Sequence, residues 1–427
     1  MMRPSATPTA AAAPRHGHAP AAVPVPARVA VVCPMAEEGW HSMDLVGDRL
    51  LEHLAAEHAA EFRAERVRPA MVRRAERLPA IGGGRAAALA DRLLNRFGDY
   101  PRRLRALRGA FDLFHLVDHS YGQVARALPS SRLVVTLHDL DAFRCVLEPA
   151  RDPRPRWRRA MAARQMEALR TAARVVCVSQ AVADEAIALG VVPAERIRVA
   201  HNGIDEACTP RADPAADAGA ARLLGPARAD APELLHVGST VPRKRIDVLL
   251  RTAAAVLRER PGARLVRVGG PFDGEQAALA RELGIGGPSL VVLPFLDRAT
   301  LAAVYRRAAV VLQPSSAEGF GLPVAEALAC GTPVVASDLP VLREVAGAAA
   351  GYRPVGDVAG WTRAVLELLA EREADGAAWE ARRRRAAERG GRFSWREHAA
   401  RVADVYREVL REAGGAPGPG RWARWTS

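Results

Sequence analysis

The 427-residue sequence contains almost no lysine: of its 61 basic residues, 60 are arginine and one, Lys244, is lysine. It also lacks any uncharged apolar run approaching the ~18–20 residues that a membrane-spanning helix needs. The segment from Met1 to Ala27 mixes Ala, Pro, His and Thr without a continuous apolar core. This composition predicts a disordered tail and argues against a signal peptide.

Cysteines and aromatic residues are scarce as well. The five cysteines are scattered, with no C-x-x-C pair, so the sequence suggests neither a disulfide framework nor a zinc or other metal site, and it predicts a reduced, cytoplasmic compartment. Aromatic residues make up 5% of the chain, and no recognition-helix or RNA-binding signature accompanies the arginines. A nucleic-acid-binding protein is therefore disfavoured, although the net charge of +13 keeps it as an alternative.

The arginine excess has two interpretations. So extreme a bias resembles a coding preference, in which a given arginine is simply the default cation of a solvated surface. The eight arginines of Arg151–Arg174 and the dense set across Arg63–Arg108 also fit a basic face that meets anionic lipid headgroups or a phosphorylated lipid acceptor. Lys244 stands apart, because arginine occupies every other cationic position.

Short β-branched runs alternate with longer Ala-, Leu- and Arg-rich stretches, which is typical of repeated βαβ units and a parallel sheet. The strands predicted in the first half are Arg28–Cys33, Asp112–Val117, Arg132–Leu137, Arg174–Val178 and Ile197–Ala200. Helices are predicted between them over Ser42–His58, with Ser42 as the N-cap, Arg85–Arg108 and Arg156–Ala172.

From Asp205 to Pro232 the chain is rich in Pro, Ala, Asp and Gly, which indicates an interdomain linker with a loop. The alternation then resumes, with strands predicted at Leu234–Val237, Arg264–Val268, Leu290–Leu293, Ala309–Leu312 and Pro333–Ala336 and helices at Arg243–Arg260 and Leu301–Ala308. Open parallel sheets bind ligands at the carboxyl ends of their strands, so two such domains place a site in the cleft between them. The expected boundaries are 1–27 for a disordered tail, 28–205 and 206–393 for the two domains, and 413–427 for a flexible tail.

The strongest motif is the segment from Gln313 to Glu326, Gln-Pro-Ser-Ser-Ala-Glu-Gly-Phe-Gly-Leu-Pro-Val-Ala-Glu. A strand ends near Gln313, two glycines let the backbone approach a ligand, and Pro323 fits the first turn of a helix. The positive end of that helix favours a diphosphate. Glu318 and Glu326 can both face this pocket and accept hydrogen bonds from sugar and ribose hydroxyls.

A second motif, His236–Leu250, joins a strand, a tight turn at Gly238 and a helix start that carries Arg243 and Lys244. An Arg-Lys pair at a helix start is common on a plain surface, but Lys244 is the one lysine of the sequence, which favours a functional role for the pair.

These segments resemble glycosyltransferase family 4, the retaining, mannosyltransferase-like enzymes of the GT-B fold. The first motif matches the family's E-x7-E signature, and Cys330–Asp338 is similar to the strand and turn that follow it. The resemblance extends over Arg28–Arg411 and implies two Rossmann-like, doubly wound parallel-sheet domains that face a cleft. The final predicted helix, Phe393–Glu412 with Ser394 as its N-cap, would return to the first domain over residues 394–412.

The resemblance also implies roles for residues on the donor side. Glu318 would contact the hydroxyls of the donor sugar and Glu326 the ribose. The backbone N–H groups of Phe320, Gly321 and Leu322 would contact the sugar.

Other donor-side residues would hold the nucleotide. Gly238 and Ser239 with Arg243 and Lys244 would hold the donor diphosphate, although many members have an arginine where Ser239 stands. Phe295, just past a strand of the second domain, lies in the region that usually meets the nucleobase.

Acceptor-side residues are expected in the first domain. Val134–Phe143 resembles the family's His-Asp pair at a strand end, which makes His138 a cleft residue in contact with the acceptor or the donor sugar, with His119 and Asp139 beside it. Gly39 stands alone where many members have a Gly-Gly loop. No general base is implied, because the leaving phosphate is usually described as taking the acceptor proton.

The predicted function is a hexosyltransferase that moves a sugar from a nucleoside-diphosphate donor, of GDP-mannose or UDP-hexose type, to a glycan or lipid-linked acceptor with retention and without metal or other cofactor. Cell-envelope or exopolysaccharide biosynthesis is the expected setting, in the cytoplasm or peripherally on the inner face of the membrane. The catalytic residues would be Glu318, His138, Lys244 and Arg243. A sugar-nucleotide epimerase or a phosphorylase on the same fold is the first alternative, and a basic nucleic-acid-binding protein the second.

Overall fold

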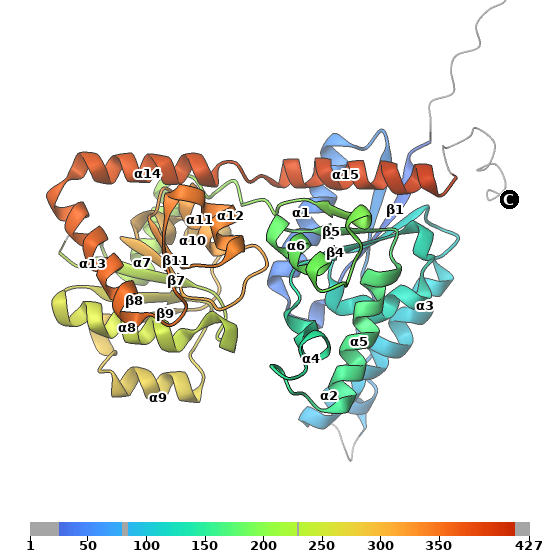
Figure 1. Cartoon of the computed structure of the whole chain (residues 1–427), viewed down its shortest axis with the longest axis horizontal. Helices are drawn as coiled ribbons and strands as arrows, with labels where there is room; N and C mark the ends of the chain where they lie inside the picture. The colour runs from blue at the N-terminus through green and yellow to red at the C-terminus, as the bar shows by residue number, and fades with distance from the viewer. Residues whose placement is uncertain (1–24, 79–83, 229, 415–427) are drawn as a thin grey trace, which may run out of the picture.

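The computed structural model describes residues 25–78, 84–228 and 230–414, which form two α/β domains, each built around a six-stranded sheet (Figure 1). The strand order is β2-β1-β3-β4-β5-β6 in the first sheet and β12-β11-β10-β7-β8-β9 in the second. Neighbouring strands pair in parallel in both sheets. The predicted α/β class with two doubly wound parallel sheets is confirmed.

The first domain follows the predicted alternation of strands and helices. Its strands are β1 (Ala27–Val32), β2 (Phe62–Val67), β3 (Leu113–Leu116), β4 (Leu133–Leu137), β5 (Arg174–Cys177) and β6 (Ile197–Val199). Its helices are α1 (His41–Glu57), α2 (Arg85–Leu94), α3 (Tyr100–Ala106), α4 (Arg144–Leu147), α5 (Arg156–Thr171) and α6 (Gln180–Ala188). A short π-helix over Asn95–Asp99 joins α2 to α3, so the helix predicted over Arg85–Arg108 is nearly continuous.

The second domain repeats the pattern. Its strands are β7 (Glu233–Val237), β8 (Arg264–Val268), β9 (Leu290–Leu293), β10 (Val310–Gln313), β11 (Val334–Ser337) and β12 (Ala350–Arg353). The helices that follow the first domain are α7 (Pro214–Leu224), α8 (Ile246–Glu259), α9 (Gly274–Glu282), α10 (Arg298–Arg307), α11 (Leu322–Ala329), α12 (Pro340–Ala346), α13 (Val358–Ala374), α14 (Gly376–Gly390) and α15 (Trp395–Glu412).

Three local expectations were wrong. The segment Asp205–Pro232 is more than a linker, because α7 begins within it at Pro214, where Asp213 accepts hydrogen bonds from two backbone N–H groups. Ser42 lies inside α1 and does not cap it, since the helix begins at His41. The helix predicted from Arg243 begins later, because Arg245 adopts a left-handed conformation with φ of 49°.

Two strands escaped the sequence-based prediction, β2 and β12, and both lie at a sheet edge. Their side chains are largely half-buried or exposed, and β2 carries three charged residues among its six. Edge strands need no continuous apolar run, so they lack the signal that marks the central strands.

The last helix leaves the second domain and packs on the first, as predicted. In Figure 1, α14 lies along the second domain and α15 continues across the first. Ser394 caps α15 by accepting a hydrogen bond from the N–H of Glu397 at 3.1 Å. Tyr406 of α15 then joins the first domain's core, where its hydroxyl lies 2.7 Å from Nδ1 of His115.

The two predicted tails fall mostly outside the described residues, which begin at Val25 and end at Gly414. The first-domain boundary shifts by one residue, because Ala27 already belongs to β1. All five cysteines are buried and free. Among the described residues, no helix combines the length and apolarity needed to cross a membrane.

Candidate active site

The sheet order of the second domain brings the two predicted donor motifs together. β7 and β10 are neighbours in the sheet and run parallel, so the loops after Val237 and Gln313 leave the same edge. The first loop leads to Lys244 and the second to Glu318.

Glu318 and Lys244 form a buried ion pair at this edge. Nζ of Lys244 lies 2.6 Å from Oε1 of Glu318, and the two side chains are only 9% and 6% exposed. The same carboxylate oxygen accepts hydrogen bonds from Ser315 Oγ at 2.7 Å and Gln313 Nε2 at 2.5 Å. Burial alone would raise the pKa of Glu318, but Lys244 and then Arg243 outweigh it and lower the pKa to about 2. Glu318 is therefore ionised near neutral pH.

Arg243 links this ion pair to the first domain. Its Nη1 donates to Ala317 O at 3.1 Å and lies 3.3 Å from Oε2 of Glu318. On its other side it lies 3.5 Å from Asp141 and 3.9 Å from Asp139. Burial opposes its charge, but Glu318, Asp139 and Asp141 together raise the pKa of Arg243.

A buried arginine that the sequence interpretation missed supports the turn at Gly238. Arg267, on β8, is 0% exposed and donates from Nη2 to Gly238 O at 3.0 Å and from Nη1 to Gly270 O. Burial lowers the pKa of Arg267. Its position inside the otherwise apolar strand Arg264–Val268 could have marked Arg267 as a buried charge.

Glu326, in contrast, lies in a separate set of contacts on α11. Its Oε1 lies 3.2 Å from Nη1 of Arg298, and its Oε2 accepts from the hydroxyl of Tyr305 at 3.0 Å. Burial raises the pKa of Glu326 in spite of Arg298 and Tyr305. The two glutamates of the motif are thus shifted in opposite directions, which fits different roles. Arg298 and Tyr305, on α10, had no motif to mark them.

The loop after Glu318 packs directly on the first domain. Ser179 Oγ donates to Gly319 O at 2.7 Å, and a Cβ on Gly319 would lie only 1.8 Å from the carbonyl oxygen of His138. Phe320 is buried, and its ring centroid lies 5.3 Å from that of Phe393, just before α15. This loop, Gly319–Gly321, called the donor loop after its predicted role, therefore touches the segment that carries His138.

His138 and His119 lie side by side at this contact, with ring centroids 5.9 Å apart. The backbone N–H of His138 donates to Nδ1 of His119 at 3.2 Å, and Nε2 of His138 donates to Val117 O at 2.7 Å. These partners place the proton of each ring on Nε2. Burial, followed by His119, lowers the pKa of His138, so its ring is neutral at pH 7.

The remaining residues predicted on the donor side lie in or next to loops of the second domain. Gly321, with φ of 89°, precedes α11, whose first residue is Leu322. Ser239 is exposed in the turn after Gly238. Phe295 follows β9 with 62% of its surface exposed.

On the acceptor side, the carboxylate of Asp139 accepts from the N–H of Asp141 at 3.0 Å, close to Arg243. Gly39 ends a short 3-10 helix over Ala36–Glu38 with φ of 68°, and a Cβ there would meet nothing within 4 Å.

The fold matches solved glycosyltransferase structures along most of the chain. Sucrose-phosphate synthase from Thermosynechococcus elongatus superposes with a TM-score of 0.68 at 21% identity, covering 90% of this chain and 99% of that one. The HepE protein of Anabaena, solved in complex with UDP and glucose, gives a TM-score of 0.64 at 18% identity, covering 90% of this chain and all of that one. The architecture is thus that of GT-B glycosyltransferases, as predicted.

Sequence comparison then gives the family. A model described as "Glycosyl transferases group 1" matches residues 231–371, and one described as "Glycosyltransferase Family 4" matches residues 48–207. The D-inositol 3-phosphate glycosyltransferase of Saccharomonospora viridis is 35% identical over 321 residues, which cover 71% of each chain. The chain belongs to the group 1, family 4 glycosyltransferases and is a glycosyltransferase. Of the protein classes that the sequence left open, the comparisons support the glycosyltransferase.

Proposed function

We propose that this enzyme transfers a hexosyl group from a nucleoside-diphosphate sugar to a hydroxyl acceptor with retention of the anomeric configuration. The ion pair between Glu318 and Lys244, set where the donor loop touches His138, is the observation that supports this most. Glu318 is ionised and can accept hydrogen bonds from sugar hydroxyls, while Lys244 and Arg243 supply positive charge for a diphosphate.

Glu326 suits the ribose of the donor. Its carboxylate is held by one guanidinium and one phenol, so it retains lone pairs for vicinal hydroxyls. A donor of UDP-hexose type is supported by the UDP and glucose bound in HepE, and a GDP-mannose type donor by the resemblance of the motifs to mannosyltransferases.

Two classes of acceptor follow from different observations. The sequence interpretation favours a glycan or lipid-linked acceptor in cell-envelope or exopolysaccharide biosynthesis. The name of the Saccharomonospora relative favours D-inositol 3-phosphate, a phosphorylated polyol. Assaying transfer to each with one radiolabelled donor separates them. The cytoplasmic location, peripheral on the inner face of the membrane, is part of the same proposal.

The donor class is tested by thermal shift against GDP, UDP, ADP and dTDP. A nucleotide present at 100 times its Kd adds roughly 2.7 kcal/mol to the free energy of unfolding, so the matching nucleotide should raise the Tm by several degrees. The corresponding nucleoside, which lacks the diphosphate, is the control and should have a much smaller effect. A chain whose Tm responds to none of the four nucleotides would contradict the proposed donor.

Metal independence is tested by removing divalent ions. Because Lys244 and Arg243 together carry two positive charges at the proposed diphosphate position, transfer should proceed at an unchanged rate in excess EDTA. The control is the same assay with added magnesium. Activity that disappears in EDTA and returns with magnesium would show that the leaving diphosphate needs a metal.

A further inference from the structure

Helix α2 is attached to the first domain by its polar face. Asp91 of α2 and Asn95, the first residue after it, are 0% and 2% exposed and lie four residues apart on the buried side. The Asp91 carboxylate accepts hydrogen bonds from the N–H groups of Arg74, Ala75 and Glu76 at 2.8–3.0 Å. The side chain of Asn95 both donates to and accepts from the backbone of Val72.

The opposite face of α2 presents leucine to solvent. Leu89 and Leu93, on that face, are 55% and 42% exposed, and Leu94, on the flank of the helix, is 52% exposed. At 100° per residue, Leu89 and Leu93 lie on one stripe, directly across the helix from Asp91. A helix at a protein surface normally buries its apolar side and exposes its polar side. In α2 the polar side is buried and the leucines face solvent.

Arginines border the leucine stripe. Arg85 and Arg92 lie on the same side of α2 and are exposed. Between residues 71 and 96 the sequence has six arginines and two acidic residues, and one of those acids is the buried Asp91. Four of these arginines also have a carboxylate partner within 4.0 Å: Arg73 with Glu76, Arg74 with Asp99, and Arg92 and Arg96 with Glu38. The segment that α2 holds through Asp91 and Asn95 adds exposed Val72 and Leu78, at 45% and 50%.

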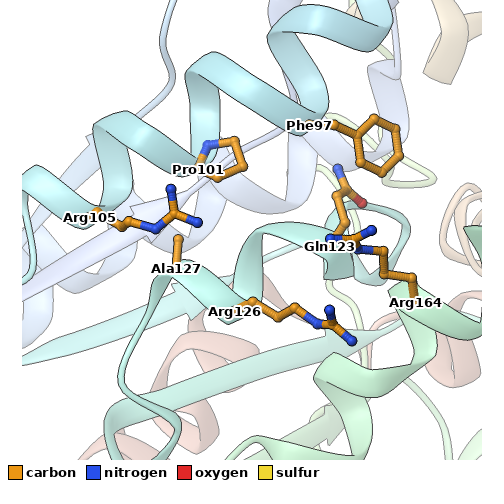
Figure 2. A pocket seen from close by; sticks show the side chains of 7 residues that line it. All are labelled: Phe97, Pro101, Arg105, Gln123, Arg126, Ala127 and Arg164. Carbon is orange, nitrogen blue, oxygen red and sulfur yellow. The ribbon is translucent and has the colours of Figure 1, made fainter.

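A basic hollow adjoins the same helical stretch. It is lined by residues of the π-helix and α3, of a 3-10 helix over His119–Ala127 and of α5, and Figure 2 shows Arg105, Arg126 and Arg164 around it. Arg126 is paired with Glu167. The hollow thus gathers further arginines at the segment that continues α2.

We propose that the outward face of α2, with its leucine stripe and flanking arginines, binds an anionic lipid bilayer. Leucine side chains enter the headgroup boundary while arginine side chains reach up to lipid phosphates. A second copy of the chain fits less well, because a twofold contact through this face would set arginines of both copies against each other. The enzyme would thus work with α2 on the membrane surface.

The test is co-sedimentation of the full chain with vesicles of phosphatidylcholine alone or mixed with phosphatidylglycerol. Binding should require phosphatidylglycerol and weaken as salt is raised. The double variant Leu89→Ser/Leu93→Ser should bind about tenfold more weakly or worse, since it removes the inserted apolar surface. Arg85→Gln/Arg92→Gln should also weaken binding and reduce its salt dependence.

Leu223→Ser is the matched control, because Leu223 is 43% exposed on α7 of the second domain. It should bind as the wild type does. All three variants change exposed side chains, so their Tm values should stay close to that of the wild type. Failure of the wild type to bind phosphatidylglycerol vesicles would overturn the proposal, as would normal binding by the leucine variant. Conversion of an oligomer to a monomer by the leucine variant would instead identify a self-association surface.

Discussion

Glu318→Gln is expected to lower kcat/KM for sugar transfer by roughly 10²–10³-fold, because it removes the charge that orders Lys244 and Arg243 at the proposed donor position. Glutamine has nearly the same shape and keeps one acceptor oxygen, so the loop from Gln313 to Gly321 should stay in place. The measurement is steady-state transfer with the nucleotide sugar identified by thermal shift. Glu373→Gln, at a side chain 58% exposed, is the control. Unchanged transfer by Glu318→Gln would refute the assignment of this site.

Glu318→Ala should also cost stability. It leaves Lys244 buried without its carboxylate, a change that typically costs about 3–5 kcal/mol. The pH dependence has a definite sign. A carboxyl whose pKa is lowered to about 2 stabilises the folded state above its ordinary pKa and loses that contribution as the pH falls towards 2. The difference in Tm between wild type and variant should therefore be constant from pH 7 to about 5 and shrink in stronger acid.

Gly319→Ala is expected to reduce transfer by roughly 10²-fold, because a methyl group there would lie 1.8 Å from the carbonyl oxygen of His138. The clash lies between backbone atoms of two domains, so the donor loop must withdraw from the first domain. Nucleotide binding to the second domain should be less affected than transfer. Equilibrium binding and kcat, measured on the same preparation, distinguish the two effects.

The control for that substitution is Gly274→Ala, at the start of α9, where a new Cβ meets nothing within 4 Å. It should leave both binding and transfer unchanged. If Gly319→Ala transfers sugar at the wild-type rate, the close contact between the loop and His138 is not needed for the reaction.

The central strands could be predicted from the sequence, and so could the placing of Glu318 and Lys244 in one site, but the ion pair between them was not predicted. Parallel strands buried on both faces are continuous apolar runs, and functional residues follow their carboxyl ends. Once β7 and β10 are recognised as strands of one sheet, Lys244 and Glu318 must leave the same edge. The direct hydrogen bond between them still depends on sheet order, which the strand pattern does not specify.

Other parts had no such signal. The partners of Glu326 come from α10, and nothing in a single sequence marks Arg298 and Tyr305 as neighbours of α11. The contact of Gly319 with His138 joins residues 181 positions apart, so only the packing of two domains reveals it. Arg267 did have a signal, a charge inside an apolar strand, but in a chain with 60 arginines it did not stand out until its complete burial was seen.

The crossing of α15 onto the first domain has a consequence for the order of assembly on the ribosome. One core of the first domain contains Val402, Tyr406 and Val409 of α15 together with Val31 of β1. Its first strand is thus synthesised before the whole of the second domain, and the helix that completes its packing is synthesised after that domain. The second domain has all of its strands synthesised by Arg353, so the usual order, in which the amino-terminal domain is finished first, is reversed here. The first domain must therefore keep an apolar surface uncovered until α15 has been synthesised.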